Sequence, residues 1–318
     1  MSIDSTVDTP LRLTVAICTW NRCASLQQTL EGFTRIDVPA GVDWELLVVN
    51  NNCTDATDDV IRRFEHRLPV RRAAEPTPGL SHARNRAVAE SHGDYIIWTD
   101  DDVTVVPGWL SAYVAAFRSR PQAAIFGGPI RPTFDGTPPE WLTRIYPTIA
   151  GVYAACDLGP EVVPFHQWAT PWGANYALRR REQVANLYDP ELGYRPGRLI
   201  GWEETEVIRA LLASGAEGWW VPDAALQHHV PPARQTTKYL RSHFYNRGRY
   251  YGSRWTEDDR PQPFMFGRPR WMWRKAITSE LRYRIRRVAS TPEIWIEDLI
   301  KASETWGILN GYRRVEAS

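Results

Sequence analysis

The stretch YIIWTDDDV (residues 95–103) joins a short apolar run to three consecutive aspartates. The run YIIW suits a buried strand, because it is apolar and rich in aromatic and branched side chains. Three like charges at the end of a strand repel one another. Asp100, Asp101 and Asp102 therefore need a positive charge, which either the chain supplies or a ligand brings.

Segments on the N-terminal side of this stretch alternate between strand-like and helix-like patterns. The strand-like runs are LTVAICTW (13–20), WELLVVNN (44–51) and VRRAAE (70–75), and the helix-like segments are 24–33, 55–68 and 81–92. Strands that are buried on both faces and separated by helices indicate a parallel sheet. The sequence therefore predicts an α/β fold with a doubly wound, mostly parallel sheet and flanking helices.

Polar residues follow three of the predicted strands, which are those near 13–20, 44–51 and 95–98. The polar residues are Thr19–Arg22, Asn50–Asn52 and Asp100–Asp102. Ligands of such sheets bind beyond the carboxyl ends of the strands, so we expect the three loops to face one crevice. Carboxylate oxygens there suit Mg²⁺ or Mn²⁺, and such an ion would neutralise the cluster and hold a diphosphate. The alternative interpretation of the aspartates is a solvated acidic turn.

Composition and charge indicate which partners and which location to expect. The chain has 318 residues and a formal net charge of +1, so bulk charge does not favour nucleic acid as a partner. Its 15 Trp and 13 Tyr residues are typical of sugar-binding surfaces and of membrane interfaces. The four cysteines form no CxxC pair, the first residues lack a signal-peptide pattern, and no run of about 18 apolar residues exists. These features predict a cytoplasmic protein.

The second half of the chain mixes weak and strong patterns. We expect loops and short strands over 128–200, a helix over 201–215, and a strand near 219–230 that ends in two histidines. From Arg268 to Arg287 there are eight basic residues and one acid, with an apolar stripe of Trp273, Ile277, Leu281, Ile285 and Val288. This pattern predicts a basic amphipathic helix. It would lie on an anionic membrane, or pack its stripe on the main domain with its arginines in solvent.

Several segments together resemble a family 2 glycosyltransferase with the GT-A fold, from about Leu13 to about Trp255. The segments are VAICTWNR, LLVVNNNCTDAT, GLSHARNRAVAESHGDYIIWTDDD, WGANYALRR, GWEETEV and VPDAALQHHV. The resemblance implies a GT-A domain over 1–255, with a nucleotide-binding half over about 11–105 and an acceptor-side half over about 106–255. Residues 256–318 would form a helical, basic C-terminal extension.

The resemblance also implies roles on the donor side. Asp100 and Asp102 match the two acids of the family's DxD motif, and Asp102 would hold Mn²⁺ or Mg²⁺ most directly. His228 matches a late histidine that completes the metal shell, with His229 as the alternative. The residues expected around the nucleotide-sugar are Thr19, Asn21, Arg22, Asn50, Asp55, Arg84, Asn85, Asp100 and Asp101. Asn50 departs from the family's usual Asp, which leaves the identity of the base open, and Asp55 alternatively caps the following helix.

A second set of implied roles concerns the acceptor. Glu204 occupies the position of the family's catalytic Asp and would take the proton of the acceptor hydroxyl, while Glu203 would orient a loop or a hydroxyl. Alternatively, these acids only favour the positive end of a helix. The acceptor-side residues are Trp172, Gly173, Asn175 and Trp202.

The implied function is an inverting, hexosyltransferase-type glycosyltransferase. It would move a sugar from a nucleoside-diphosphate donor, by family habit a UDP-sugar, to a hydroxyl of a glycan or lipid-linked acceptor in cell-surface polysaccharide synthesis. The protein would be cytoplasmic or peripheral at the inner face of the membrane. Two alternatives are a sugar-nucleotide-forming nucleotidyltransferase, although ICTWNRCAS lacks the expected glycine-rich loop, and a non-catalytic glycan-binding module. A glycosidase with paired carboxylates would have no use for a diphosphate crevice.

Overall fold

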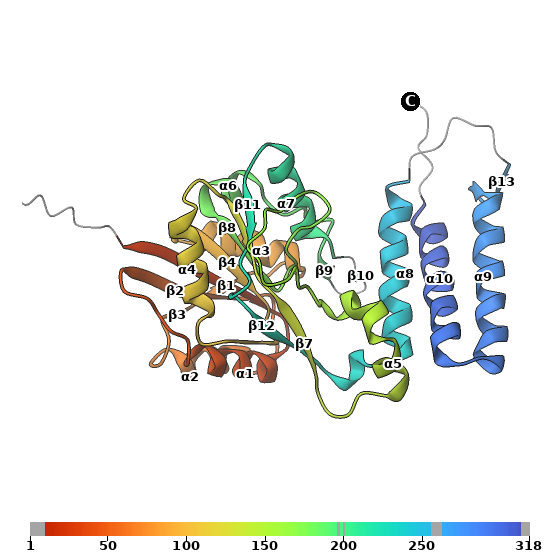
Figure 1. The fold of residues 1–318 in the computed structure, drawn as a ribbon, viewed down its shortest axis with the longest axis horizontal. Coiled ribbons are helices and arrows are strands. Elements are labelled where there is room, and N and C mark those ends of the chain that lie inside the picture. The colour runs from red at the N-terminus through yellow and green to blue at the C-terminus, as the bar shows by residue number, and fades with distance from the viewer. Residues whose placement is uncertain (1–9, 196–197, 200, 256–262, 313–318) are drawn as a thin grey trace, which may run out of the picture. The chain divides into compact units, whose positions relative to one another are not determined.

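The computed structural model describes residues 10–195, 198–199, 201–255 and 263–312 (Figure 1). The polar amino-terminal segment up to residue 9 and residues 256–262 of the expected extension lie outside the described residues. The chain divides into two compact units, each built from three stretches. The first comprises 1–133, 154–196 and 201–229, and the second comprises 134–153, 197–200 and 230–318. The expected domain boundary after residue 255 stays a prediction, and helix α8 (Thr237–Ser253) groups with the C-terminal helices.

The first unit contains a seven-stranded sheet in the order β11-β6-β8-β4-β1-β2-β3. These strands are β1 (Leu11–Thr19), β2 (Val42–Asn50), β3 (Val70–Ala74), β4 (Tyr95–Thr99), β6 (Ile125–Gly127), β8 (Asn175–Arg179) and β11 (Gly218–Trp220). Neighbouring strands run parallel, except that β8 is antiparallel to both β4 and β6. A smaller sheet has the order β5-β12-β7, with β5 (Val103–Val105), β12 (Leu226–Val230) and β7 (Ile130–Phe134). The predicted mostly parallel α/β fold is therefore confirmed.

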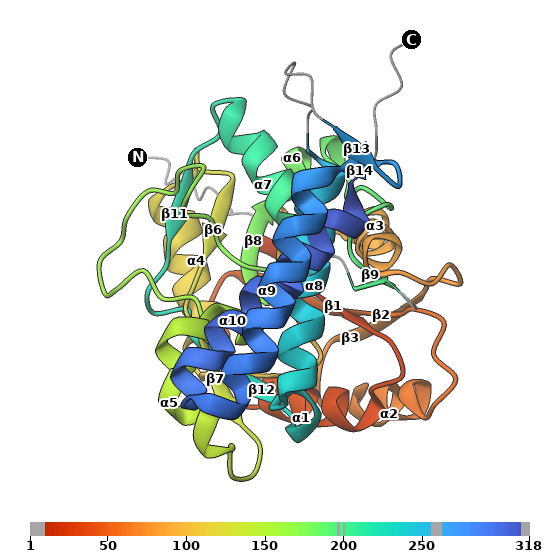
Figure 2. The same ribbon diagram turned by 90° about the vertical axis from the view of Figure 1, so that its right-hand side faces the viewer.

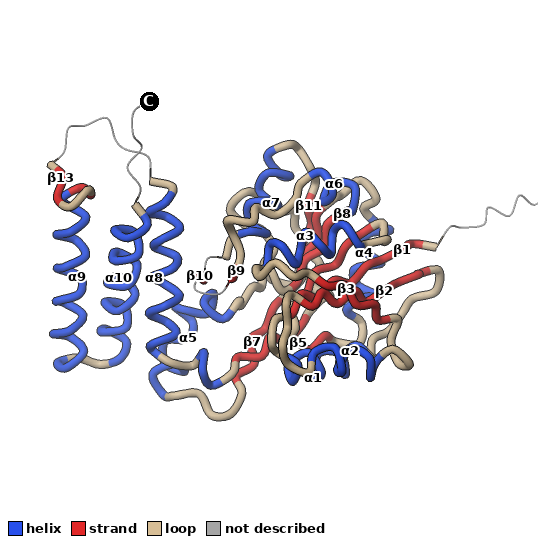
Figure 3. The backbone as a smooth tube through the Cα atoms, turned by 180° about the vertical axis from the view of Figure 1, so that it is seen from behind, coloured by secondary structure: helices blue, strands red, loops and turns tan. Residues whose placement is uncertain are grey.

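Helices cover both faces of the large sheet. They are α1 (Cys23–Phe33), α2 (Thr57–Phe64), α3 (Leu80–Glu90), α4 (Trp109–Ser119), α6 (Arg180–Ala185) and α7 (Glu203–Ala213). Helices α1 and α2 lie on one face and α3 on the other (Figures 1 and 3). Because both faces are covered, the central strands are apolar throughout: Val15, Ala16 and Ile17 of β1 are fully buried.

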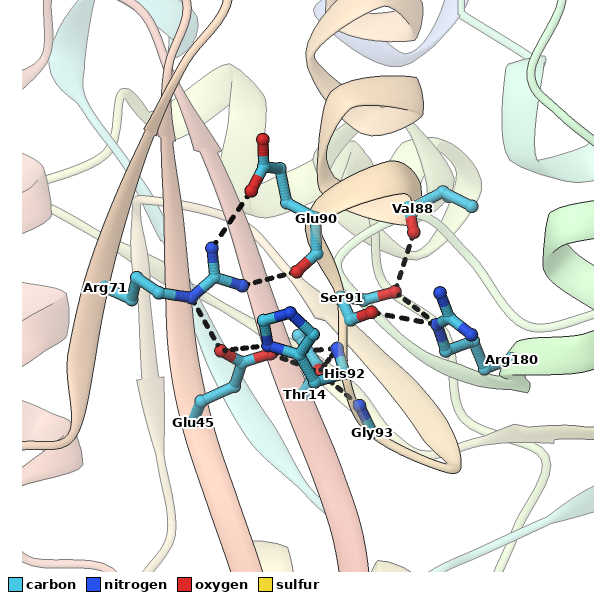
Figure 4. A network of polar contacts seen from close by, with 9 residues as sticks. All are labelled: Thr14, Glu45, Arg71, Val88, Glu90, Ser91, His92, Gly93 and Arg180. Carbon is cyan, nitrogen blue, oxygen red and sulfur yellow. Dashed lines mark hydrogen bonds and ion pairs between the residues drawn. The ribbon is translucent and has the colours of Figure 1, made fainter.

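A polar network joins the sheet to helix α3 far from the carboxyl ends of the strands (Figure 4). Glu45 of β2 accepts hydrogen bonds from Thr14 Oγ1 at 2.7 Å and from Arg71 Nε at 2.9 Å. Arg71 of β3 also donates to the backbone carbonyl of Glu90 at the end of α3. Thr14 Oγ1 accepts from the backbone N–H of Gly93 at 2.9 Å, in the turn that leads into β4. The network therefore fixes three strands, a helix end and a turn together.

The second unit is largely helical, as expected for the C-terminal region. Its helices are α5 (Glu140–Ile149), α8, α9 (Arg270–Ala289) and α10 (Pro292–Gly311), with short strands β10 (Arg198–Leu199), β13 (Phe264–Met265) and β14 (Arg268–Pro269). Helix α10 lies between α8 and α9 (Figures 1 and 3). The prediction of loops and short strands over 128–200 missed α5, because a proline within the segment, Pro147, argues against a helix.

Glycines bring α8 and α10 into backbone contact. A Cβ atom on Gly248 would lie 2.2 Å from the carbonyl oxygen of Glu304, and one on Gly307 would lie 2.1 Å from that of Tyr245. Gly252 and Gly311 are equally close to the opposite backbone, at 2.3 Å from Ile308 O and 2.2 Å from Arg249 O. Each helix therefore presents two glycines four residues apart to its partner, which permits an approach that larger residues would prevent. None of the described helices is long and apolar enough to cross a membrane.

Candidate active site

The carboxyl ends of β1, β2 and β4 lie beside one another at one edge of the large sheet. The register pairs Thr19 with Asn50 and Ile17 with Thr99, so the loops that follow these strands start close together. Strand β8 runs the other way, and its first residue, Asn175, lies opposite Thr99. The acceptor-side segment that precedes β8 therefore reaches the same edge as the donor-side loops.

An arginine of the chain supplies positive charge to the aspartates. Arg22 donates from Nη1 to Asp101 Oδ1 at 2.6 Å and from Nη2 to Asp102 Oδ2 at 2.5 Å. Thr19 Oγ1 donates to Asp101 Oδ2 at 2.7 Å. Burial raises the pKa of Asp101, Arg22 lowers it and Asp102 raises it again, and the net direction is upward. The aspartates are thus a buried, organised cluster rather than a solvated turn, since Asp101 and Asp102 are 3% and 4% exposed.

The same cluster has the donor atoms of a metal site. One ligand atom each of Asp100, Asp102 and His228 lies within 4.8 Å of the others. His228 Nε2 is 3.3 Å from Asp102 Oδ1, whereas the next residue, His229, places its Nε2 2.9 Å from Thr104 Oγ1. Side chains alternate along β12, so the two histidines face opposite sides. Two carboxylates and one imidazole are a set that fits a divalent cation such as Mn²⁺, and the geometry favours His228 over His229.

The loops after β1 and β2 hold each other through side-chain amides. Asn21 has a left-handed backbone (φ 50°), and its Oδ1 accepts from the backbone N–H of Thr54 at 2.7 Å. Asn50 donates to Asp58 Oδ1 at 2.6 Å and accepts from the backbone N–H of Cys53 at 2.8 Å. The carbonyl oxygen of Asn50, which we expected to face the base, therefore already has one partner in the loop.

Two further loop residues, Asp55 and Asn51, form hydrogen bonds with backbone groups of nearby segments. Asp55 accepts from the backbone N–H of Cys23 at 2.9 Å and of Thr57 at 3.1 Å, so it joins the starts of α1 and α2. Asn51, which the sequence did not single out, donates to Thr77 O at 2.7 Å and accepts from the N–H of Gly79 at 2.9 Å. Asn51 therefore shapes the loop that leads into α3, and its position in the NNN run was the available signal.

Arg84 links the donor side to the predicted catalytic acids. Its Nη1 donates to Glu203 Oε1 at 2.9 Å and lies 3.7 Å from Glu204 Oε2. Its Nη2 donates to the carbonyl oxygen of Gly173 at 3.3 Å. The guanidinium is almost fully buried and lies 5.5–5.8 Å from the ring centres of three aromatic residues, which are Trp98, Tyr176 and Tyr188. Such an enclosed cation is held in one position.

The two glutamates at the start of α7 differ in accessibility. Glu203 is 2% exposed, and burial, opposed by Arg84 and assisted by Glu204, raises its pKa. Asp100 also raises the pKa of Glu203, so the two acidic clusters interact. The side chain of Glu204 is 15% exposed, and a Cβ on Gly173 would lie 3.5 Å from its Oε1. Only Glu204 of this pair has a carboxylate that an acceptor can reach.

Three buried polar atoms at this edge lack hydrogen bonds within the described part of the chain. They are Thr99 Oγ1, Glu203 Oε2 and His228 Nδ1. Buried polar atoms in native proteins are almost always paired with protein, water or a ligand. Their presence beside the acidic clusters indicates a site that a ligand or solvent completes.

The remaining predicted residues are placed as follows. Trp172 and Trp202 are partly exposed, and Trp202 has φ 78° immediately before α7, a conformation that costs about 1–3 kcal/mol and often marks a functional site. Asn175 is fully buried and bonds Trp109, Tyr113, Pro129 and Ala224, so its amide faces the fold rather than an acceptor. Asn85 exchanges two hydrogen bonds with the backbone of Tyr188, at 2.8 and 2.9 Å.

Comparison with solved structures identifies the class of fold. A mannosyltransferase, PcManGT from Pyrobaculum calidifontis in complex with GDP-Man and Mn²⁺, superposes with a TM-score of 0.59 at 15% identity, over 93% of this chain and 87% of that one. S. aureus TarS 1-349 in complex with UDP gives a TM-score of 0.52 at 12% identity, over 93% and 89%. At these identities the likeness establishes the fold, which is that of the GT-A glycosyltransferases.

The sequence identifies the family. Residues 14–191 match the family model described as Glycosyl transferase family 2. The Succinoglycan biosynthesis protein ExoM of Rhizobium meliloti (strain 1021) is 24% identical over 245 residues, which are 76% of this chain and 74% of that protein. Validoxylamine A glucosyltransferase of Streptomyces hygroscopicus subsp. jinggangensis (strain 5008) is 30% identical over 118 residues, 36% of this chain and 28% of that protein. The chain belongs to glycosyltransferase family 2 and is a glycosyltransferase.

Proposed function

We propose that this glycosyltransferase transfers a sugar from a nucleoside-diphosphate donor to a hydroxyl group of a growing or lipid-linked glycan, with inversion at the anomeric carbon. The observation that carries the proposal is the placement of two acidic clusters at one sheet edge: Asp100, Asp102 and His228 on one side, Glu203 and Glu204 on the other. One cluster suits a diphosphate with its cation, and the other suits the base that an acceptor needs.

Asp100, Asp102 and His228 would hold the divalent cation, which supplies positive charge beside the donor diphosphate. Mn²⁺ is proposed over Mg²⁺ because an imidazole belongs to the donor set. Mn²⁺ is also the cation in the PcManGT complex. Arg22 bridges Asp101 and Asp102 and adds a fixed cation at the same place. The chain thus offers positive charge where the leaving group gains negative charge.

Glu204 is proposed as the general base and the Arg84–Glu203 pair as its support. Glu204 removes the proton of the acceptor hydroxyl while the new C–O bond forms at the anomeric carbon. The bond to the diphosphate oxygen breaks on the opposite face, and its electron pair leaves with the nucleoside diphosphate. Glu203 is unsuited to the proton transfer, because its Oε1 is bound to Arg84 and the residue is 2% exposed.

The donor base and the acceptor are proposed from the family resemblance and from similar proteins. One related structure holds GDP-Man and another holds UDP, so the two do not select one base. UDP is proposed from the family resemblance, and a polysaccharide acceptor from the similarity to ExoM, a succinoglycan biosynthesis protein. Family membership favours a transferase over a nucleotidyltransferase or a glycan-binding module. The cytoplasmic location stays a prediction.

The test is a thermal-shift screen of UDP, GDP and their sugar conjugates, each with Mn²⁺, with Mg²⁺ and with chelator. A ligand that binds the folded state raises Tm by mass action, by several degrees at saturating concentration. We expect one nucleotide to act only with the metal. In Asp102→Asn this metal-dependent shift should disappear, whereas in Asp59→Asn, an exposed aspartate of α2, it should remain. A nucleotide shift that needs no metal, or that survives in Asp102→Asn, contradicts the proposed site.

A further inference from the structure

Helix α9 has an apolar row on the side that faces away from α10. Its buried side chains are Met272, Ala276, Ser279 and Tyr283. At 100° per residue, the side opposite to these carries an outer stripe, which comprises Ile277, Leu281, Ile285 and Val288. Their exposed fractions are 44%, 55%, 67% and 90%, in that order. Four of the five residues of the predicted stripe are therefore exposed, whereas Trp273 is partly buried. The helix is apolar on two faces.

Positive charge accompanies the outer stripe. Arg270 and Arg274 lie on the same side of the helix by the same periodicity, and both are exposed. Within the described residues, neither takes part in an ion pair. The only acid of α9, Glu280, binds Arg241 of α8 at 2.8 Å and Arg284 at 3.0 Å. No carboxylate of α9 is left to balance the arginines beside the stripe.

An aromatic residue extends the stripe at its amino-terminal end. Phe266 stands at the tip of the β13–β14 hairpin with φ 51°, is 79% exposed, and packs edge-on against Trp273 at 5.8 Å. From Ile277 to Val288 the helix rises about 17 Å at 1.5 Å per residue. An exposed apolar row of this length is uncommon on a soluble surface and marks an interaction site.

A hollow beside the stripe is suited to an anionic group. Its volume is about 430 Å³, and its lining includes Arg241, Arg284, Arg287 and Val288. Three guanidinium groups face one carboxylate, that of Glu280. Guanidinium groups bind phosphate oxygens strongly and in defined directions. The hollow adjoins Val288, the most exposed apolar side chain of the stripe.

We propose that α9 docks on the surface of a membrane that contains anionic phospholipids. The helix lies along the surface, with the outer stripe and Phe266 in the interfacial layer and the arginines at the lipid phosphates, which is the chemistry of interfacial basic amphipathic helices. A second copy of the chain fits less well. Two stripes packed in parallel would bring Arg270 and Arg274 against the same residues of the second copy without an acid between them, and an antiparallel pair would leave these arginines unbalanced.

The experiment is flotation of the full chain with vesicles of phosphatidylcholine alone and of phosphatidylcholine with about one third phosphatidylglycerol. We expect binding to the anionic vesicles only, and release at high salt, since surface attraction is screened. In Leu281→Gln/Ile285→Gln the partition coefficient should fall about a hundredfold, because two apolar side chains no longer enter the interface. In Arg270→Gln/Arg274→Gln it should fall about tenfold or more.

A matched control removes apolar surface elsewhere. Leu187 is 56% exposed, close to the 55% of Leu281, and lies in the first unit. Leu187→Gln should bind vesicles as the unaltered chain does. The outer-stripe variants should keep the metal-dependent nucleotide shift, so failure of membrane binding is distinguishable from failure of the proposed function.

Two results would overturn the membrane proposal. One is equal partitioning of the unaltered chain and Leu281→Gln/Ile285→Gln. The other is a lipid-free dimer, seen by light scattering, that Leu281→Gln/Ile285→Gln converts to a monomer, since the stripe would then bind a second copy.

Discussion

Arg84 is the residue that holds the predicted catalytic acids at the start of α7. It binds Glu203 through one nitrogen and the Gly173 carbonyl through another, and three aromatic rings enclose it. A side chain added at Gly173 would lie 3.2 Å from its Nη2 and 3.5 Å from Glu204 Oε1. The position of Glu204 is therefore set by a glycine and a buried ion pair together, and the accessible carboxylate has little freedom to move.

The residue-scale prediction concerns Glu204, the proposed general base. Glu204→Gln should keep donor binding while turnover falls about 10²–10⁴-fold, because the amide cannot take the acceptor proton. Steady-state rates and donor affinity measure the two effects. Glu206→Gln removes a charge from the same helix turn and should keep near-normal turnover. Equal losses in both variants would indicate that the acids serve only the helix end.

Some site residues could be predicted from the sequence and others could not. Asp100, Asp102 and Glu204 follow or begin regular elements, so their placement at one edge follows from the topology of a parallel sheet. Asn175 was predicted as an acceptor-side residue, but its amide bonds groups from three distant segments, and only the folded structure brings those together. Nothing in the sequence indicated that Arg22 bridges Asp101 and Asp102.

At the scale of elements, the sheet is fixed at both ends by polar contacts of different kinds. The carboxyl ends carry the site, and the opposite region carries the Glu45 network (Figure 4). Strand runs and long helices were predictable because their apolar periods are strong, whereas α5 was not, because it contains Pro147. The close packing of α8 on α10 was also unpredicted, since glycines four residues apart reveal a contact only when the partner helix is known.

The element-scale prediction is a pH dependence at Glu45. Burial raises the pKa of Glu45, but bonds from Arg71, Thr14 and the N–H of His92 outweigh it and lower the pKa below the usual 4.5. A lowered folded-state pKa stabilises the protein above the unfolded-state value, and this contribution is lost as pH falls through the folded-state pKa. Glu45→Gln should therefore lower the free energy of unfolding by about 1–3 kcal/mol at neutral pH.

Urea unfolding across pH measures this effect. The difference between the unaltered chain and Glu45→Gln should shrink as the pH falls below 4.5, the usual value that applies to the unfolded state, and should be lost once Glu45 is protonated in the folded state as well. Glu31→Gln is the control, because Glu31 pairs with Arg67 in solvent and surface pairs contribute little. A constant difference from neutral to acid pH would show that the Glu45 charge does not contribute to stability.

At the scale of the whole molecule, the two units have separate cores and interleaved sequences. Within the second unit, α5 from the middle of the chain lies beside α10 from its C-terminal part (Figure 2). The core of the second unit combines residues from α5, α8, α9 and α10, including Leu142, Leu240, Tyr283 and Leu299. If α10 is removed, α8 loses the helix against which its glycines pack. That face of α8 is then exposed to water. The sequence predicted a helical C-terminal extension from residue 256, since the family resemblance ended near there.

The molecular-scale prediction follows from this shared core. A chain that ends after residue 255 should unfold in its second unit and aggregate, as measured by size-exclusion chromatography and proteolysis of 230–255. In the full chain, Gly307→Ala should weaken the same unit by a few kcal/mol, because its Cβ would lie 2.1 Å from Tyr245 O. Gly108→Ala is the control and should not weaken the protein, because a Cβ at Gly108 would have no other atom within 4 Å. A shortened chain that stays monomeric and protease-resistant would show that the extension is separable.

The interleaving of the two units also restricts how such a protein can be recombined. Consider a hybrid that takes only its C-terminal helices from a relative. Its residues 134–153 would still come from this chain and would not match the new helices, because that stretch lies in the middle of the sequence yet belongs to the second unit. A working exchange must carry 134–153 and 230–318 together and leave 154–196 and 201–229 in place. Exchange of one C-terminal segment at a single junction should therefore fail, whereas joint exchange of the stretches that form the second unit should succeed.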